Sequence, residues 1–218
     1  ARVALCGIGG VGGYTVEALA RSGVGALDLI DDDKVCLTNL NRQIIATRKT
    51  VGKFKVDVAE ERVHDIDPDI RVTTHRCFFG PETQDDFDFT QYDYVVDAID
   101  TLSPKLALIK GALDRSLPLV SSMGAGAKTA PTKMEIADIS KTHHCPLAHM
   151  LRKRLHKLGV RSGFKAVFSP EAMREGARIL CDEQNKKSNV GTISYIPALF
   201  GIGCASVAIS DLIGELEG

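Results

Sequence analysis

The sequence predicts an α/β fold: a Rossmann-like, doubly wound, mainly parallel sheet with a C-terminal antiparallel extension and a crossover loop. Between residues 3 and 121, short apolar runs alternate with segments of helical periodicity, as in chains that build parallel sheets. A glycine-rich turn, Gly7-Ile-Gly9-Gly10-Val-Gly12, follows the first apolar run. After residue 126 the pattern changes, and residues 133–139 alternate polar and apolar side chains, which is typical of an exposed-face or antiparallel strand.

The first elements predict the opening half of a βαβ unit. Residues 3–6 form a buried strand, residues 14–22 carry apolar side chains at helical spacing, and residues 27–30 form the second strand. Gly7 permits the tight turn, Gly9 lets the backbone approach a phosphate, and Gly12 lets helix and strand pack closely. Gly10, in the same turn, is a further candidate for cofactor binding. Asp31 stands at the end of the second strand, at the spacing of a ribose-hydroxyl acceptor. A nucleotide site is therefore expected.

The remaining elements continue this alternation. A helix begins near residue 51 and ends before Pro68, and a second helix spans residues 102–113, with Lys105 and Lys110 on its polar side. Strands are expected at 70–74, 94–97, 117–121 and 164–168, and a helix with an early proline at 146–158. Residues 170–189 are polar and charged, and we expect a mobile crossover loop there.

Composition limits the functional classes. The chain has 218 residues, 44% of them hydrophobic, and a net charge of −1, so nothing attracts nucleic acid or membranes globally. The cysteines form no C-x-x-C pair, which argues against a structural zinc site and fits a reducing cytoplasm. Residues 188–210 carry no formal charge, and we expect a buried helix rather than a membrane span. The chain starts almost inside its first strand, so a preceding segment is expected to be missing.

Cationic and acidic residues next to the glycine turn change the prediction from a nucleotide to a triphosphate with a metal. Arg42 can grip a phosphate with two hydrogen bonds, and Lys55 supplies a movable point charge. Asp100 follows the strand at 94–97 and should face the same crevice, where a carboxylate can hold Mg²⁺, assisted by Asp31 or Asp33. These residues favour carboxylate adenylation by ATP over hydride transfer.

These motifs resemble the nucleotide site of the ubiquitin-activating-enzyme-like superfamily. The matching segments are Leu29–Asp33, Asn39–Gln43, Val51–Lys55 and Asp97–Asp100, and the resemblance covers nearly the whole chain. It implies that Asn39, Arg42 and Lys55 contact the phosphates, Asp31 the ribose and Asp100 Mg²⁺, and Gln43 is a further nucleotide-binding candidate. It also implies a homodimer and a single adenylation domain over 1–218, with a nucleotide-binding half at 1–122 and an acyl-substrate half at 123–218.

One branch of the superfamily fits best. Ser122–Gly126, Ala137–Thr142, Cys145–Ala148 and Arg152–Leu155 resemble the tRNA threonylcarbamoyladenosine dehydratase family. This resemblance implies ATP-dependent activation of the threonylcarbamoyl carboxylate on tRNA, followed by cyclisation with loss of water. It also raises a cysteine-desulfurase or sulfur-acceptor system as a partner. Around residues 186–189 this chain lacks the cysteine of part of the family, and Cys181 is the nearby substitute, although cyclisation needs no enzyme nucleophile.

A basic segment offers a local surface for tRNA. Its candidate phosphate contacts are Lys141, Arg152, Lys153, Arg154 and Lys157, with His143, His144 and His156 among them. The alternative interpretation is a solvated helix whose apolar side, with Leu151, Leu155 and Leu158, packs inward. The adjacent histidines have no matching ligands at metal-site spacing.

Other functions stay open at this point. An activator of a ubiquitin-like or sulfur-carrier protein would use the same site but needs a small partner with a Gly-Gly tail. A nicotinamide-dependent oxidoreductase would share the glycine turn and Asp31 but gives Arg42, Lys55 and Asp100 no joint role. A non-catalytic binding module would not need the cationic set.

Overall fold

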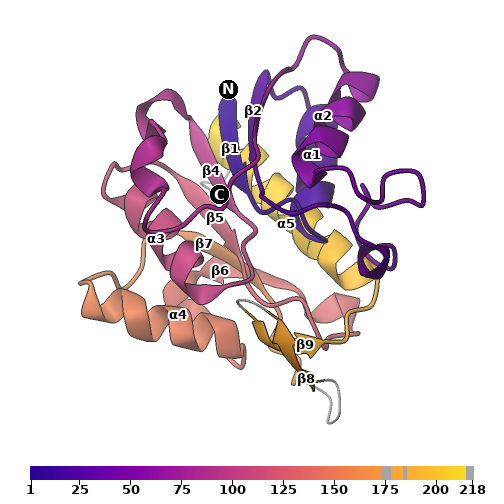
Figure 1. Ribbon diagram of the computed structural model, residues 1–218. Coiled ribbons are helices and arrows are strands. Elements are labelled where there is room, and N and C mark those ends of the chain that lie inside the picture. Colours follow the sequence, from indigo (N-terminus) through magenta and orange to yellow (C-terminus); the bar gives the residue numbers. More distant parts are fainter. Residues whose placement is uncertain (173–177, 184–185, 215–218) are drawn as a thin grey trace.

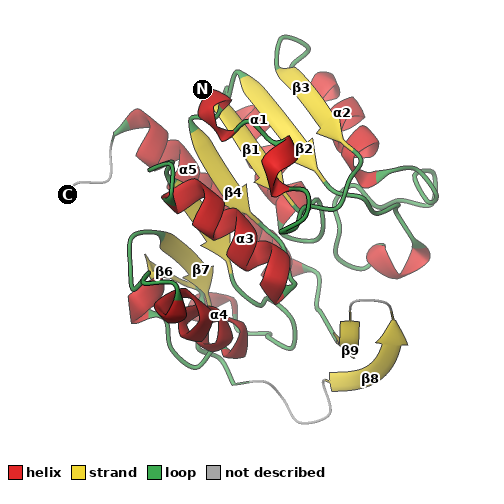
Figure 2. Ribbon diagram, turned by 60° about the vertical axis from the view of Figure 1, so that its left-hand side comes forward, coloured by secondary structure: helices red, strands yellow, loops and turns green. Residues whose placement is uncertain are grey.

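A seven-stranded sheet forms the centre of the molecule. The computed structural model describes residues 1–172, 178–183 and 186–214, with side chains for 1–172 and 191–214. The sheet contains β1 (Arg2–Cys6), β2 (Ala26–Ile30), β3 (Arg71–His75), β4 (Tyr94–Asp97), β5 (Leu119–Ser122), β6 (Glu135–Asp138) and β7 (Lys165–Phe168). Its order is β3-β2-β1-β4-β5-β7-β6, and every neighbouring pair is parallel except β6 with β7 (Figure 1; β3 is labelled in Figure 2). The predicted fold class is confirmed.

Helices cover both faces of the sheet (Figures 1 and 2). The helices α1 (Gly12–Arg21), α2 (Lys55–Ile66) and α5 (Tyr195–Ile213) cover one face, and α3 (Leu102–Leu113) and α4 (Pro146–Lys157) cover the other. Because successive strand residues point to opposite faces, Val3 and Leu5 enter one core while Ala4 and Cys6 enter the second. Strands buried on both faces explain the continuous apolar runs in the sequence.

Short helical turns and one irregular segment lie in the connections between the strands and helices. The 3-10 turns are η1 (Leu37–Asn39), η2 (Gln84–Asp86), η3 (Phe89–Gln91), η4 (Pro131–Lys133) and η5 (Ile139–Lys141). The segment between β2 and α2 closes on itself, because Val35 N donates to Lys53 O at 2.9 Å and Lys34 bridges to Phe54. This closure places Lys55 at the first residue of α2, beside the end of β2.

The apolar helix near the C-terminus is a helix of the core. By length and composition alone α5 could cross a membrane, with a mean hydropathy of 1.8, but half of its most apolar window is buried in this fold. A Cβ at Gly201 would lie 2.4 Å from Val11 O, so the backbones of α5 and the α1 start almost touch. The expected buried helix is thus observed, although it begins at Tyr195 rather than near residue 188.

Three local expectations were wrong. The segment expected as a mobile crossover loop, residues 170–189, contains an antiparallel pair, β8 (Arg178–Glu183) and β9 (Lys186–Val190). Leu158 is 48% exposed rather than packed inward, because α4 ends at Lys157 and Leu158 leaves the helical stripe. Lys105 is fully buried rather than on a polar face, because α3 turns it toward a buried carboxylate of β4.

Candidate functional site

A large cleft opens where the strand order reverses. Connections from β1 run outward to β2 on one side, whereas β4 continues the sheet on the other, and in open α/β sheets ligands bind beyond the carboxyl ends at such a point. The cleft has a volume of about 730 Å³, and we call it the switch-point cleft. The predicted site residues that line it are Gly7, Gly9, Gly10, Asp31, Asp33, Asn39, Arg42, Gln43, Lys55 and Asp100. Gly12 is the exception and lies beneath the turn.

The positions in the turn require glycine for different physical reasons. Gly7 has φ +92°, and a Cβ there would lie 2.8 Å from Ala98 O, so the turn after β1 sits directly against the segment after β4. A Cβ at Gly12 would lie 1.8 Å from Gly7 O, so only glycine fits where α1 begins. A Cβ at Gly9 would instead meet nothing closer than 3.8 Å. The chain itself therefore does not require glycine at position 9, although the close approach of a ligand would.

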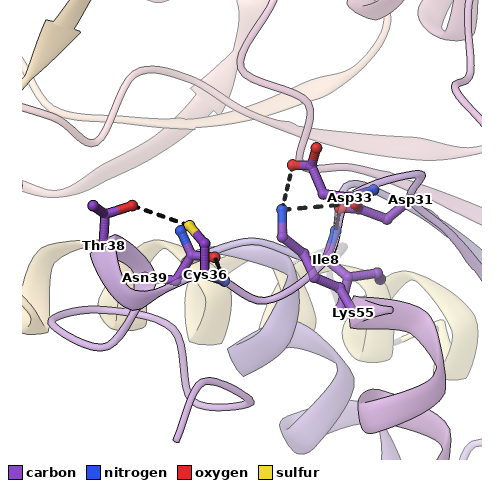
Figure 3. A network of polar contacts seen from close by, with 7 residues as sticks. All are labelled: Ile8, Asp31, Asp33, Cys36, Thr38, Asn39 and Lys55. Atoms are coloured by element: carbon purple, nitrogen blue, oxygen red, sulfur yellow. Dashed lines mark hydrogen bonds and ion pairs between the residues drawn. The ribbon is translucent and has the colours of Figure 1, made fainter. Parts of the chain in front are cut away.

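Lys55 lies between two carboxylates at the end of β2 (Figure 3). Its Nζ is 2.5 Å from Asp33 Oδ2 and 3.6 Å from Asp31 Oδ1. Burial lowers the pKa of the Lys55 ammonium, but the charges of Asp31 and Asp33 outweigh burial, and the net shift is upward. Lys55 therefore stays charged at neutral pH. Since the Asp33 side chain is 67% exposed, Lys55 can exchange this partner for an incoming phosphate.

Asp31 has a second role in holding the glycine turn. Its Oδ2 accepts a hydrogen bond from Ile8 N at 2.6 Å, and its Oδ1 accepts one from Asp33 N at 2.9 Å (Figure 3 draws Ile8 beside it). Burial raises the pKa of the Asp31 carboxyl, while Lys55 and the two N–H donors oppose that shift. Asp31 thus joins the β1 and β2 turns at the rim of the switch-point cleft.

A second group of site residues comes from the turn η1 and the residues that follow it. Asn39 is buried and its Oδ1 accepts from Cys36 N at 3.1 Å, which orders the turn (Figure 3). Arg42 Nη1 donates to Thr38 O at 2.8 Å, and its stem lies against Gly10, whose Cβ would be 3.4 Å from Arg42 Cγ. Gln43 Oε1 is buried and has no hydrogen-bond partner among the described residues. Gln43 also lines the cleft, so this unsatisfied oxygen belongs to a side chain that can bind a ligand there.

Acidic side chains at the cleft suit a divalent cation held with phosphate oxygens. Asp100 is exposed, lines the switch-point cleft and is close enough to raise the pKa of Lys55 by its charge. The carboxylates of Asp31, Asp32 and Asp33 have oxygen atoms within 4.8 Å of one another. Magnesium takes oxygen ligands, usually one or two carboxylates plus phosphates. The donor set therefore fits Mg²⁺ once a polyphosphate supplies the remaining oxygens.

Several residues of the cleft were not predicted as site residues. On the side away from α2 the lining consists of mostly small residues at and after the end of β5, together with one residue before α5 and one in its first turn: Ser122, Met123, Gly124, Ala125, Gly126, Thr192 and Pro197. On the β3 side it includes Phe78, which is 46% exposed. A glycine-alanine run directly after a strand was a usable signal for the first group. The position of Phe78 depends on the long β3–β4 connection, which carries no periodic pattern.

The basic segment lies on a different surface. Among the candidates for nucleic-acid contact, Lys141 is in η5 and the others are in α4, and the cleft lining does not include them. Lys141, Lys153, Arg154 and Lys157 are exposed, whereas Arg152 is half-buried and donates to Thr142 Oγ1. Leu151 and Leu155 fill the core beneath, so this helix has both an apolar inner side and a cationic outer side. Cys181 lies in β8, where the side chains are outside the described part of the chain.

Known proteins resemble this chain over its whole length. The model of the ThiF family matches residues 1–217. The tRNA threonylcarbamoyladenosine dehydratases of Bacillus subtilis and Escherichia coli are 42% and 44% identical to it, and each alignment covers 99% of this chain and 88% and 87% of those proteins. The crystal structure of the E. coli enzyme in complex with ATP superimposes with a TM-score of 0.89 at 38% identity, covering 100% of this chain and 88% of that one. The chain belongs to the ThiF family, in the group of the tRNA threonylcarbamoyladenosine dehydratases.

Proposed function

We propose that this protein is an ATP-dependent tRNA threonylcarbamoyladenosine dehydratase. The observation that carries the proposal is the switch-point cleft, in which a phosphate-binding glycine turn, two cationic side chains and an exposed carboxylate meet beside a wall of small residues. This combination suits adenylation of a carboxylate, because it offers charge for a triphosphate and space for an acyl group. The whole-chain likeness to the enzymes of that name supplies the substrate.

The reaction divides into two steps. A carboxylate oxygen of the threonylcarbamoyl group attacks the α-phosphorus of ATP, and pyrophosphate leaves. A heteroatom of the same modified nucleoside then attacks the activated carbonyl carbon and loses its proton, and AMP leaves with the former carboxylate oxygen. The nucleoside becomes cyclic and has lost one water in total. Because the nucleophile belongs to the substrate, the second step needs no cysteine of the enzyme.

We assign each residue a role that its position in the cleft supports. Arg42 and Lys55 neutralise the phosphates, the glycine turn and the α1 start offer N–H groups to them, and Asn39 and Gln43 bind beside them. Asp31 accepts from the ribose, Asp33 releases Lys55 toward the phosphates, and Asp100 holds Mg²⁺. Magnesium would withdraw charge from the leaving pyrophosphate. The lining from Ser122 to Gly126 receives the acyl group.

The proposed partners use other surfaces. The tRNA binds to the cationic side of α4 and reaches the cleft with its modified nucleoside. A second copy of the chain covers the outer side of α5, where Ile202 and Ile213 are 48% and 59% exposed. The protein works in the cytoplasm. A cysteine-desulfurase or sulfur-acceptor protein is proposed as a further partner, and copurification with a cysteine desulfurase tests it.

Pyrophosphate release from ATP and Mg²⁺ tests the activity. We expect release only when the tRNA carries threonylcarbamoyladenosine, and none with the same tRNA lacking that modification. Equal release with both tRNAs would contradict the proposal. Release driven instead by a small protein with a Gly-Gly tail would show the second candidate, an activator of a carrier protein, which the same cationic cleft would also serve.

A further inference from the structure

A buried ion pair lies directly under the floor of the switch-point cleft. Lys105 on α3 and Asp97 at the end of β4 are both 0% exposed, and Lys105 Nζ is 2.6 Å from Asp97 Oδ2. Lys105 Nζ also donates to Ser121 Oγ at 3.1 Å and to Ser122 O at 2.8 Å, at the end of β5. Ser121 Oγ in turn donates to Asp97 Oδ2 at 2.5 Å. One ammonium therefore binds the ends of two adjacent strands; we call this group the floor brace.

The floor brace is hydrogen-bonded to the turn that carries Asp100. The second oxygen of Asp97, Oδ1, accepts from Ile99 N at 3.1 Å, which fixes the first peptide units after β4. Gly7 packs against Ala98 in that turn, because a Cβ added to Gly7 would lie only 2.8 Å from Ala98 O. Asp100 follows at once, so its backbone is set by a carboxylate that Lys105 orients.

The same brace controls the opposite wall. Lys105 Nζ binds the carbonyl of Ser122, the last residue of β5, and the lining segment up to Gly126 begins there. Burying an ammonium and a carboxylate removes both from water, and their attraction and hydrogen bonds must offset that loss of hydration. An apolar pair would fill this space at less cost. The brace therefore points to a requirement for geometry rather than for stability.

We propose that Lys105 and Asp97 are positioning residues for the reaction, which hold the Asp100 turn and the acyl-binding wall at a fixed separation. The inference rests on the proposed function for the identity of the ligands. If the brace has this role, its loss should weaken Mg²⁺-dependent ATP binding and catalysis. Its loss should have little effect on ATP binding without metal. Partners that orient a metal ligand typically change metal affinity or activity by about 10- to 100-fold when removed.

The test measures ATP affinity by calorimetry with and without Mg²⁺, in the absence of tRNA. The variants are Asp97→Asn, Ser121→Ala and Lys105→Met, and the thermal midpoint of each is recorded. Ser121→Ala removes one hydroxyl and leaves the ion pair, so it keeps the test valid if the charge variants do not fold. Asp28→Asn is the matched control, because Asp28 is also a buried aspartate, paired with Arg2 and His75, but does not line the cleft.

The expected result is that Mg²⁺ tightens ATP binding to the wild type and to Asp28→Asn. In Asp97→Asn and Lys105→Met this tightening falls by about 10- to 100-fold while metal-free ATP binding is unchanged, and in Ser121→Ala, which keeps the ion pair, it falls by less. The inference is overturned if these variants keep the full Mg²⁺ effect, if the wild type shows none, or if affinity falls equally with and without metal. A failure of the proposed function is distinct: the wild type would bind ATP and Mg²⁺ but release no pyrophosphate with the modified tRNA.

Discussion

Replacing Gly9 by alanine separates the needs of the fold from the needs of the ligand. The added Cβ would meet no atom closer than 3.8 Å, and Gly9 does not have the left-handed φ that other residues avoid. The substitution therefore costs the folded protein little, and the reduced freedom of the unfolded chain stabilises it by about 0.4–1 kcal/mol. The methyl group does, however, occupy the space in which a phosphate would approach the turn.

The size of the effect on binding follows from the hydrogen bonds that are lost. A hydrogen bond to a charged group contributes about 1.5–3 kcal/mol, so losing one between the turn and a phosphate weakens ATP binding by about 10- to 100-fold. Calorimetric titration with ATP measures this change, and the thermal midpoint of the unliganded protein measures stability. We expect weaker binding with an unchanged or slightly raised midpoint.

Two other glycines provide the controls. Gly25→Ala also adds a Cβ whose nearest neighbour is 3.8 Å away, but far from the cleft, so ATP affinity should not change. Gly12→Ala would place a Cβ 1.8 Å from Gly7 O and should lower both the midpoint and the affinity. The reasoning is refuted if Gly9→Ala binds ATP as tightly as the wild type, or if it unfolds as readily as Gly12→Ala.

Three further predictions concern metal, tRNA and pH. Asp100→Asn should lower Mg²⁺-dependent pyrophosphate release by about 100-fold or more with an unchanged thermal midpoint, and normal release would exclude Asp100 as the metal ligand. Lys153→Glu with Lys157→Glu should weaken tRNA binding and reduce its salt dependence, whereas Lys49→Glu, exposed elsewhere, should not; equal effects would exclude α4 as the tRNA surface. Burial raises the pKa of the Asp28 carboxyl, but hydrogen bonds from His75 and Arg2 outweigh it and hold that pKa below its ordinary value near about 4. The ionised Asp28 carboxylate therefore stabilises the fold above the ordinary pKa, and this contribution is lost as the pH falls through the lower pKa of the folded protein. The thermal midpoint of Asp28→Asn should thus depend less on pH below about 4 than that of the wild type.

The order of the elements was predictable because local patterns specify it. Fully buried parallel strands must be apolar on both faces, whereas the helices between them need only one apolar side. The alternation of strands and helices up to β5 can therefore be predicted from the spacing of apolar residues. The cleft was predictable for a related reason. Parallel strands end at the same edge, so residues that follow β1, β2 and β4 meet there wherever the helices lie.

The wrong expectations concern contacts between residues far apart in the sequence, which depend on the tertiary fold. Lys105 lies at helical spacing from Lys110, and a charged residue in a helix is usually exposed. The buried Lys105 ammonium is compensated by Asp97 and by the ends of β4 and β5 beneath the helix, and these contacts join residues from separate elements. Likewise, the polarity of the segment after β7 favours a loop, and the β8–β9 pairing outweighs that preference.

The measurement that tests the central claim most directly is the mass of the modified nucleoside after reaction. The protein is incubated with ATP, Mg²⁺ and tRNA that carries threonylcarbamoyladenosine, and the tRNA is then digested to nucleosides. We predict that the modified nucleoside loses the mass of one water only when ATP is present, with one AMP formed for each nucleoside converted. An unchanged nucleoside mass, in a protein that binds ATP normally, would contradict the assignment.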